Sequence, residues 1–537
     1  FQFAGTRDED FDQLATAANI DFTYPMNIAN FLDIELKAGG KISRSVREND
    51  TERTYVRVVE PGNNDCAAEW MIANGINPNQ QLQFVDFRDY DYGRGDYFLK
   101  GKRPMNFITS TSRMDRFIRL ASPCWPNHGA DSRRDDFKGT ETVSAAYAMG
   151  HFDIGKRLSI TAGVRFERFD MDYKSNFVFQ THGVDGSAII VNEIEATDPI
   201  AARRKAIADS LTNVQRTIDN FFPNLQARYQ FTDWLDVRFA YTKTLSRPDF
   251  IALIPNVFRA TSASGDGGNP YLNPTISNSY DLNMSLYANK IGLFTFGGFY
   301  KKLDNVFFGV NRLMRALPEG VNFPSNAIFT ELGLTPMANS AVINTFMNNP
   351  NPAYIKGFEI DWQTNFWYLP KPFNSIVLNA NYTRVFSEMD YQQIRIVETV
   401  QIIDRRPVIT YNEVDTVRKA RLLHQGDHII NLAMGADYKG FSGRISFRLQ
   451  GDVITSVGAR PEEDTFAENI YSWDFTLRQN LPIDGLSVTL SGVNIFHSPQ
   501  KSYRYFRRDV SESSPSNILS DVRYYPRRFE LALRYTF

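Results

Sequence analysis

The sequence predicts an all-β protein, a transmembrane antiparallel β-barrel with short periplasmic turns and long extracellular loops. Three observations predict this fold class. Apolar and polar residues alternate along many segments of about ten residues, very short and very long connections alternate between these segments, and Phe, Tyr and Trp make up 14% of the chain. No stretch approaches the roughly 18 consecutive apolar residues that a membrane-spanning helix needs. The formal net charge of −2 disfavours nucleic acid as a partner.

The alternation is clearest in two segments. In 157–169 (RLSITAGVRFERF), apolar residues occupy the even positions from Leu158 to Phe166, and polar or small residues occupy the odd positions between them. The closing segment 527–537 (RRFELALRYTF) repeats this arrangement. Successive side chains of a strand point to opposite faces, so each segment has one apolar and one polar face. A soluble β-sandwich alternates in the same way, so this pattern alone leaves both classes open.

The connections between the strands favour the membrane barrel. About fifteen strands are expected, in pairs joined by links as short as Gly155-Lys156 or Lys439-Gly440. Their approximate ranges are 14–24, 31–46, 141–154, 157–172, 221–231, 234–246, 276–288, 291–303, 353–366, 374–387, 427–438, 440–451, 469–480, 485–495 and 527–537. The long connections cover approximately 48–140, 173–220, 247–275, 304–351, 387–426, 452–468 and 496–526. Tight turns that alternate with long loops are typical of outer-membrane barrels and rare in compact domains.

The odd number of strands has a topological consequence. If the long loops are external and the last strand ends in the periplasm, the first and the last strands both run inward and cannot pair in antiparallel fashion. Single-chain bacterial barrels have even numbers of strands. We therefore expect an odd number of further strands, supplied by an absent amino-terminal segment or by a separate chain.

Several blocks of the sequence resemble, in the same order, the TonB-dependent outer-membrane receptor family. They are ETVSAAYA (141–148), FPNLQARYQFTDWLDVRFAYTKTLSRPDF (222–250), GNPYLNPTISNSYDLNMSLY (268–287), YIKGFEIDWQ (354–363) and YYPRRFELALRYTF (524–537). Family members carry about 22 strands around a plug. The resemblance therefore implies that residues 1–537 form part of such a barrel, without the amino-terminal plug and the first strands.

The resemblance also implies a function and a set of partners. It implies an outer-membrane active transporter of a Gram-negative bacterium, not an enzyme, that takes up a nutrient such as a siderophore, an oligosaccharide or a peptide. The implied partners are outer-membrane lipid, the missing plug segment or a separate chain, TonB acting through that segment, and a surface lipoprotein. The alternatives are a passive porin or barrel scaffold in a multi-protein complex, and an outer-membrane hydrolase with a site in its loops.

No catalytic, cofactor or metal site is expected from the sequence. No G-x-S-x-G motif is present, and the six histidines are scattered. His424 and His428 share a spacing of four, but neither cysteines nor a carboxylate cluster complete a set of metal ligands. We interpret them as ordinary loop residues.

Two connections carry candidate features of the extracellular side. Cys66 and Cys124 both lie in 48–140, where an oxidising exterior favours a disulfide between them. The same connection contains four aromatic residues among charged and glycine residues that suit contact with a substrate, with packing against neighbouring loops as the simpler interpretation. These residues are Tyr90, Tyr92, Tyr97 and Phe98.

The connection 173–220 is expected to contain a helix docked on the barrel rim. Asp198 and Pro199 suit a helix start, and an apolar stripe follows them. The stripe consists of Ile200, Ile207, Leu211, Val214 and Ile218. Binding of a partner is the less favoured interpretation of this helix.

Charged residues on the polar faces of the strands are expected to line the lumen. There they would be solvated or would hydrogen-bond a plug. These residues are Arg165, Glu167, Arg228, Arg238, Glu359, Asp361, Arg444 and Arg448, together with Asp474 and Arg478.

Overall fold

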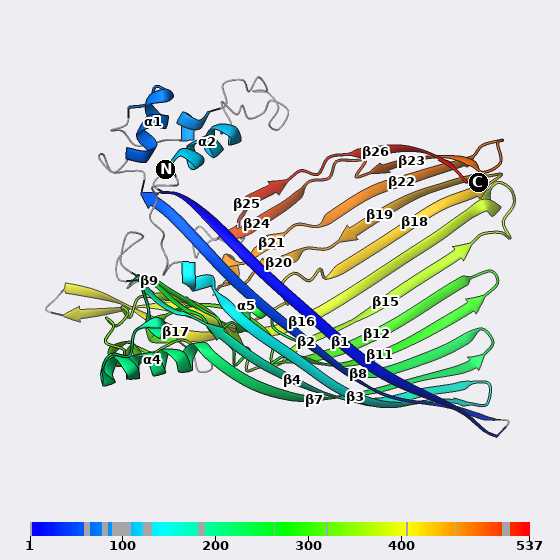
Figure 1. Ribbon diagram of the computed structural model, residues 1–537. Coiled ribbons are helices and arrows are strands. Elements are labelled where there is room, and N and C mark those ends of the chain that lie inside the picture. The colour runs from blue at the N-terminus through cyan, green and yellow to red at the C-terminus, as the bar shows by residue number, and fades with distance from the viewer. Residues whose placement is uncertain are drawn as a thin grey trace.

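The computed structural model is built mainly from antiparallel strands, and all long connections gather at one end of it (Figure 1). It describes residues 3–29, 31–57, 65–77, 84–88, 109–121, 132–180, 188–261, 264–317, 321–403, 406–458, 460–506 and 516–536. None of the described helices is long and apolar enough to cross a membrane.

The largest element is a curved 16-stranded sheet, in which consecutive strands pair along one path and β17 (Arg406–Ala420) pairs only with β16. We call the path the barrel wall. Its strands are β1 (Phe3–Ala29), β2 (Leu32–Arg57), β3 (Phe137–Ile154), β4 (Leu158–Ser175), β7 (Asn213–Thr232), β8 (Leu235–Ser246), β11 (Thr275–Ala288), β12 (Gly292–Asp304), β15 (Ala353–Asn365), β16 (Ile376–Ile403), β18 (His428–Tyr438), β19 (Phe441–Gln450), β22 (Ile470–Asn480), β23 (Leu486–Val493) and β26 (Arg528–Tyr535). Figure 1 shows the wall rolled into an open trough between β1 and β26.

The expected membrane sheet is thus confirmed, but several strands are longer than expected. β1 begins at Phe3 rather than at 14, β2 continues to Arg57 rather than ending at 46, and β16 continues to Ile403. The extra residues of β1 and β2 pair with each other without a break from Phe3↔Arg57 onward. The apolar alternation fades there, but backbone pairing needs no apolar side chains outside a membrane. Strand ends placed from hydropathy therefore lie inside the true ends of these strands.

The pairing register gives the barrel wall one continuous apolar face. Side chains of directly opposed residues lie on the same face of a sheet. Following the register from β4 to β26 places large exposed apolar residues on one face throughout. They include Val164, Leu225, Phe239, Leu282, Phe296, Leu432, Ile445, Leu477, Leu490 and Leu531. Leu282 is 56% and Leu531 73% exposed, and an apolar surface of this extent is expected to contact lipid.

Aromatic side chains mark both ends of this apolar face. Tyr280 lies between Tyr241 and Tyr300, with ring centroids 5.0 and 6.3 Å away, in a row that crosses β8, β11 and β12. At the short-turn end, Trp362 and Trp367 donate indole hydrogen bonds of 2.8 and 3.0 Å to backbone carbonyls. From Tyr280 to the turn, β11 continues for eight residues to Ala288, or about 27 Å. This span is similar to the roughly 25 Å apolar band of outer-membrane barrels.

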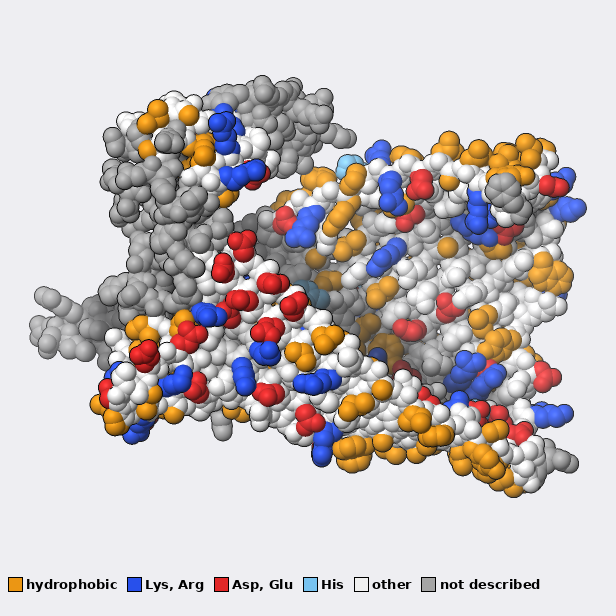
Figure 2. Space-filling view, viewed as in Figure 1, with side chains coloured by type: hydrophobic (Ala, Val, Ile, Leu, Met, Phe, Trp, Pro, Cys, Tyr) orange, Lys and Arg blue, Asp and Glu red, His pale blue; other side chains and the backbone are white. Residues whose placement is uncertain are grey.

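Beyond the apolar face, toward the long connections, the same surface of β1 and β2 becomes acidic. The register opposes Asp8 to Glu52, Asp10 to Asp50 and Asp12 to Glu48, and Figure 2 shows acidic side chains gathered over this part of the molecule. Opposed like charges destabilise a strand pair unless water screens them. This part of the surface therefore suits an aqueous exterior and not lipid.

Three long connections together form a second, six-stranded sheet, which we call the loop sheet. Its strands, in spatial order, are β13 (Phe307–Leu313), β14 (Val342–Asn348), β10 (Ser264–Gly267), β9 (Val257–Thr261), β5 (Phe177–Gln180) and β6 (Ala188–Ile190). A third sheet consists of β20 (Val453–Ser456), β21 (Thr465–Ala467), β24 (Gln500–Phe506) and β25 (Ser516–Arg523). Both were expected as irregular loops.

The loop sheet has its own hydrophobic core. Phe177, Phe329 and Ile343 are completely buried in it, and Ile207 and Leu211 of α4 (Pro199–Thr212) pack against it. The other described α-helices are α1 (Asp65–Ala73), α2 (Thr111–Ala121), α5 (Phe250–Leu253) and α6 (Asn326–Glu331). The described 3₁₀ helices are η1 (Phe84–Phe87), η3 (Arg133–Asp135), η4 (Val191–Glu193), η5 (Met314–Ala316), η6 (Phe373–Ser375) and η7 (Pro461–Glu463).

The helix α4 begins at the expected residue but ends earlier than the apolar stripe suggests. Asp198 caps it by accepting hydrogen bonds of 2.8 Å from the amides of Ile200 and Ala201. After Thr212 the chain becomes β7, so Val214 and Ile218 are strand residues. The extended pairing of 213–220 with β4 accounts for the difference. Ile200 was also expected in the stripe but is 65% exposed.

Candidate ligand-binding site on the loop sheet

The connection 247–275 brings part of the loop sheet against the polar face of the barrel wall. Glu167 on β4 forms ion pairs with Arg247 and, at 3.0 Å, with Arg165. Phe250 of α5 packs on Tyr173, with ring centroids 5.0 Å apart, and the guanidinium of Arg47 lies 4.7 Å from the Phe250 ring. These contacts hold the connection at the long-loop end of the wall.

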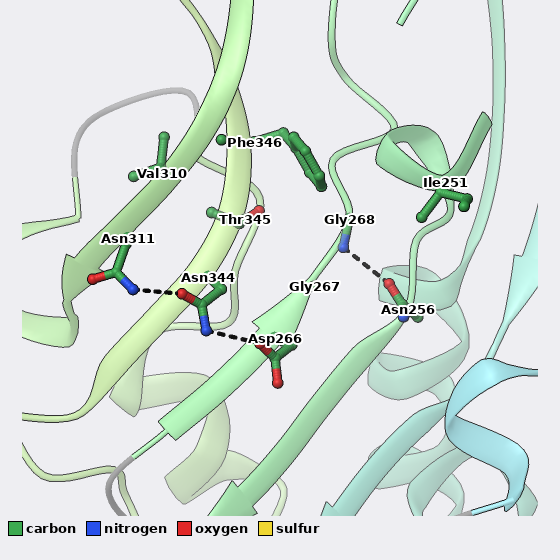
Figure 3. A pocket seen from close by; sticks show the side chains of 11 residues that line it. Ile251, Asn256, Asp266, Gly267, Gly268, Val310, Asn311, Asn344, Thr345 and Phe346 are labelled. Carbon is green, nitrogen blue, oxygen red and sulfur yellow. Dashed lines mark hydrogen bonds between the residues drawn. The ribbon is translucent and has the colours of Figure 1, made fainter. Parts of the chain in front are cut away.

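A cavity of about 460 Å³, here called the polar groove, lies where this connection meets 304–351 (Figure 3). It is lined by Ile251, Asn256, Asp266, Gly267, Gly268, Gly309, Val310, Asn311, Asn344, Thr345 and Phe346. Its volume falls in the range of roughly 300 to 1,000 Å³ that is usual for ligand pockets.

Three polar side chains form a ladder across the floor of the polar groove. The register opposes Asn311 on β13 to Asn344 on β14, and Asn344 to Asp266 on β10. Asn311 Nδ2 donates to Asn344 Oδ1 at 2.7 Å, and Asn344 Nδ2 donates to Asp266 Oδ1 at 2.9 Å (Figure 3). Each of these side chains has more hydrogen-bonding capacity than the ladder uses. The ladder can therefore donate to and accept from a ligand.

Hydrogen bonds between asparagine side chains and the backbone hold the walls of the polar groove in place. Buried Asn269 donates from Nδ2 to the carbonyl oxygen of Phe346 at 2.9 Å, which ties β14 to the connection after β10. Asn256 Oδ1 accepts from the Gly268 amide at 2.9 Å. A Cβ on Gly268 would lie 2.0 Å from the Ile254 carbonyl oxygen, so only glycine fits this approach. The groove is thus largely preformed.

The lining of the polar groove is nearly neutral. Asp266 is its one ionisable residue, and neither lysine nor arginine is among the lining residues of the described chain. Phe346, Ile251 and Val310 supply apolar surface next to the ladder (Figure 3). Planar amide and carboxylate groups beside an aromatic ring suit a ligand rich in amides or hydroxyls better than a strongly anionic one.

A second cavity, of about 630 Å³, lies along the outer edge of β13, and we call it the edge cleft. Residues Phe308 to Arg312 form one side of it, and Tyr391, Gln392 and Gln393 of β16 lie on the other. Gln393 Nε2 donates to the Val457 carbonyl oxygen at 3.0 Å, which joins β16 to the segment after β20. Both cavities share Gly309, Val310 and Asn311.

None of the site residues expected from the sequence lines either cavity in the described part of the chain. Tyr90, Tyr92, Tyr97, Phe98 and Cys124 lie outside the described residues. Cys66 lies in α1, but its side chain is outside the described set as well. The disulfide and the aromatic contacts therefore stay predictions.

The ten charged residues expected in the lumen lie on one face of the barrel wall. The register from β4 to β22 places all of them opposite the apolar face. Several are ion-paired. Arg228 and Arg238 lie 3.0 and 3.1 Å from the carboxylate oxygens of Asp236, and Arg444 lies 2.6 Å from Asp437. That they line a lumen stays a prediction.

The sequence reasoning missed the polar ladder and the edge cleft. Their residues come from separate connections that were expected to be irregular. Neither 307–313 (FFGVNRL) nor 342–348 (VINTFMN) alternates with a period of two, so their content of Phe, Val, Ile and Thr gave only a weak strand signal. His428 begins β18, and its Nδ1 lies 2.8 Å from the Tyr382 hydroxyl. Among the residues described, no cluster of metal-ligating side chains occurs.

The barrel wall has one polar face and one apolar face, and aromatic belts border the apolar face. These features are typical of an outer-membrane β-barrel protein. The match to known families gives the finer assignment. The family model described as "TonB dependent receptor-like, beta-barrel" matches residues 2–495, so the chain belongs to this family. Proteins of this family are transporters of the Gram-negative outer membrane and not enzymes, so the hydrolase alternative is set aside.

Solved structures show the same fold at low sequence identity. The unliganded ferric citrate transporter FecA is 10% identical with a TM-score of 0.52, over 99% of this chain and 56% of that one. The closed ferric-catecholate import receptor Fiu from E. coli K12 is 13% identical with a TM-score of 0.51, over 98% and 55%. The copper transporter OprC is 9% identical with a TM-score of 0.52, over 99% and 58%. The chain thus spans little more than half the length of these proteins. No curated protein matches the sequence.

Proposed function

We propose that this chain is the barrel part of a TonB-dependent receptor that captures a nutrient outside the cell and carries it across the outer membrane. The observation that carries the proposal is the position of the loop sheet. It holds a preformed polar groove, and Arg247 and Phe250 anchor that groove to the polar face of the wall. A ligand bound there would lie next to the path through the barrel.

In this proposal, energy coupling requires a plug, supplied by the same polypeptide or by a separate chain, on which TonB pulls. A surface lipoprotein is a further proposed partner. The polar ladder and its neutral lining favour a nutrient rich in amide or hydroxyl groups, such as a peptide or an oligosaccharide, over an anionic siderophore.

The proposal is tested by growth on a panel of single nutrients. A strain that lacks the gene is complemented with the wild-type gene, in backgrounds with and without TonB. We expect at least one nutrient on which growth depends on the gene and on TonB together. Gene-dependent growth that persists without TonB would contradict active uptake and favour the passive porin. An Asp266→Ala variant then asks whether the polar groove takes part, because it removes the acceptor at one end of the ladder.

A further inference from the structure

The outermost strand of the loop sheet, β13, has one edge that faces the edge cleft and pairs with no described strand. Among the described strands β13 pairs with β14 alone, because it is the first strand in the order of the sheet. We propose that this edge binds an extended peptide as an added strand. The proposal rests on the proposed uptake function and deepens it by naming the class of nutrient.

The register shows which backbone groups of β13 face the cleft. Asn349 N donates to Val306 O at 2.7 Å at one end of the strand pair, and Met314 N donates to Ala341 O at 2.8 Å at the other. Hydrogen-bonded pairs alternate along an antiparallel ladder. The even residues of β13 therefore bond to β14, and the amide and carbonyl groups of Gly309 and Asn311 point away from it. No described strand pairs with them on that side.

The edge cleft has the size and lining that an added strand needs. Its volume of about 630 Å³ lies within the usual range for ligand pockets. Gln392, Thr455 and Ser456 face β13 from the other side and offer polar groups to the second edge of a bound peptide. β13 has seven residues, so a segment of about four to seven residues, up to roughly 23 Å long, could pair with it. Strand addition of this kind is a recurring mode of peptide binding.

The polar groove would add selectivity to the backbone contacts. Gly309 and Asn311 border both cavities, so alternate side chains of an added strand would lie on the face that carries the ladder. The space around Gly309 is open, since a Cβ there would meet no atom within 4 Å. Peptides with hydrogen-bonding side chains at every second position are therefore the expected ligands.

The structure offers a matched pair of variants at Gly309. Gly309→Pro removes the outward amide and puts the proline ring at the edge, while the hydrogen bonds of the even residues to β14 remain. Gly309→Ala keeps the amide and fits the open space. We expect the proline variant to bind peptides at least about tenfold more weakly, because a hydrogen bond and the approach of the peptide are both lost. The alanine variant is expected to bind like the wild type.

The binding test uses the full-length protein, as the cell makes it, purified in detergent. It is incubated with a tryptic digest of casein, and the retained peptides are identified by mass spectrometry after gel filtration. One retained peptide is then synthesised with a single N-methyl group at each position in turn. Strand addition predicts that affinity falls at every second position, because only alternate amides of the peptide face β13. Equal migration of both variants in unheated gels checks that the barrel folds.

Three results would overturn the peptide proposal: no retained peptide, equal binding by the proline variant, or N-methyl effects without alternation. Retention of a maltodextrin mixture instead of peptides would point to oligosaccharides. The growth experiment keeps this proposal separate from the proposed function. TonB-dependent growth without peptide binding would contradict only the proposal that β13 binds a peptide. Peptide binding with TonB-independent uptake would contradict only the proposal of active transport.

Discussion

The barrel wall and the loop sheet are both β-structure, but they place their apolar side chains in opposite surroundings. The wall exposes Leu282 and Leu531 on a continuous apolar face. The loop sheet completely buries Phe329 and Ile343 in a core shared by three connections. The wall therefore depends on lipid outside it, and the loop sheet depends on packing inside it, as a small soluble domain does. Substitutions should affect the two regions independently.

The largest effect is expected in the core of the loop sheet. Phe329→Ala removes a fully buried ring and should destabilise the loop sheet by about 3–5 kcal/mol. Hydrogen exchange at the amides of β5, β9 and β14 should accelerate, and that of β11 and β12 should not change. Ile200→Ala is the control, because Ile200 is largely exposed on α4. Equal acceleration in both sheets would show that they unfold together.

The apolar face of the wall gives the next largest effect. Met284→Lys puts a charge at the middle of that face, four residues from both Tyr280 and Ala288, and should destabilise the barrel by about 2–4 kcal/mol. Asn283→Lys is the control, because its side chain lies on the polar face of the same strand. The stability of both variants is measured by refolding into lipid vesicles, followed by the mobility of unheated samples in gels. Similar losses would contradict the assignment of the faces.

The cap of α4 should give a smaller effect, confined to the loops. Asp198→Ala removes the acceptor for the amides of Ile200 and Ala201 and should cost about 1 kcal/mol of local stability. Exchange should accelerate in the first turn of α4. Asp209→Ala, in the last turn of the same helix, is the control. It should leave hydrogen exchange in the first turn unchanged.

The smallest effect is expected at the ion pair between α4 and α6. Arg203 Nε lies 2.9 Å from a carboxylate oxygen of Glu331, and the Arg203 side chain is well exposed. Arg203→Ala should therefore change the stability of the loop sheet by less than about 1 kcal/mol. A loss as large as that of Phe329→Ala would mean that this pair, and not the apolar core, joins the two connections.

The sequence predicted the wall well because the period of two is a local signal. Lipid on one face and polar contacts on the other impose it on every strand, and the charged residues from Arg165 to Arg448 all fall on the polar face. Strand ends were less predictable. Outside the membrane, β1 and β2 continue through backbone pairing without apolar alternation, as Asp10 opposite Asp50 illustrates.

The loop sheet could not be predicted from local pattern. Its ladder joins Asp266, Asn344 and Asn311 from two connections, and its core adds Phe177 from a third. Each strand has only three to seven residues and gives a weak signal alone. The pairing of such strands is fixed by long-range packing, which a single sequence does not display.

Spin labels along β11 test most directly that one face of the barrel wall contacts lipid and the other does not. Single cysteines are placed in turn at positions 279 to 287, with Cys66 and Cys124 replaced by serine, and the protein is reconstituted in lipid. The collision rate of each nitroxide with oxygen, which concentrates in lipid, is then measured. We predict high rates at the even positions and low rates at the odd ones. Uniform rates, or the opposite alternation, would contradict the assignment of the apolar face to lipid.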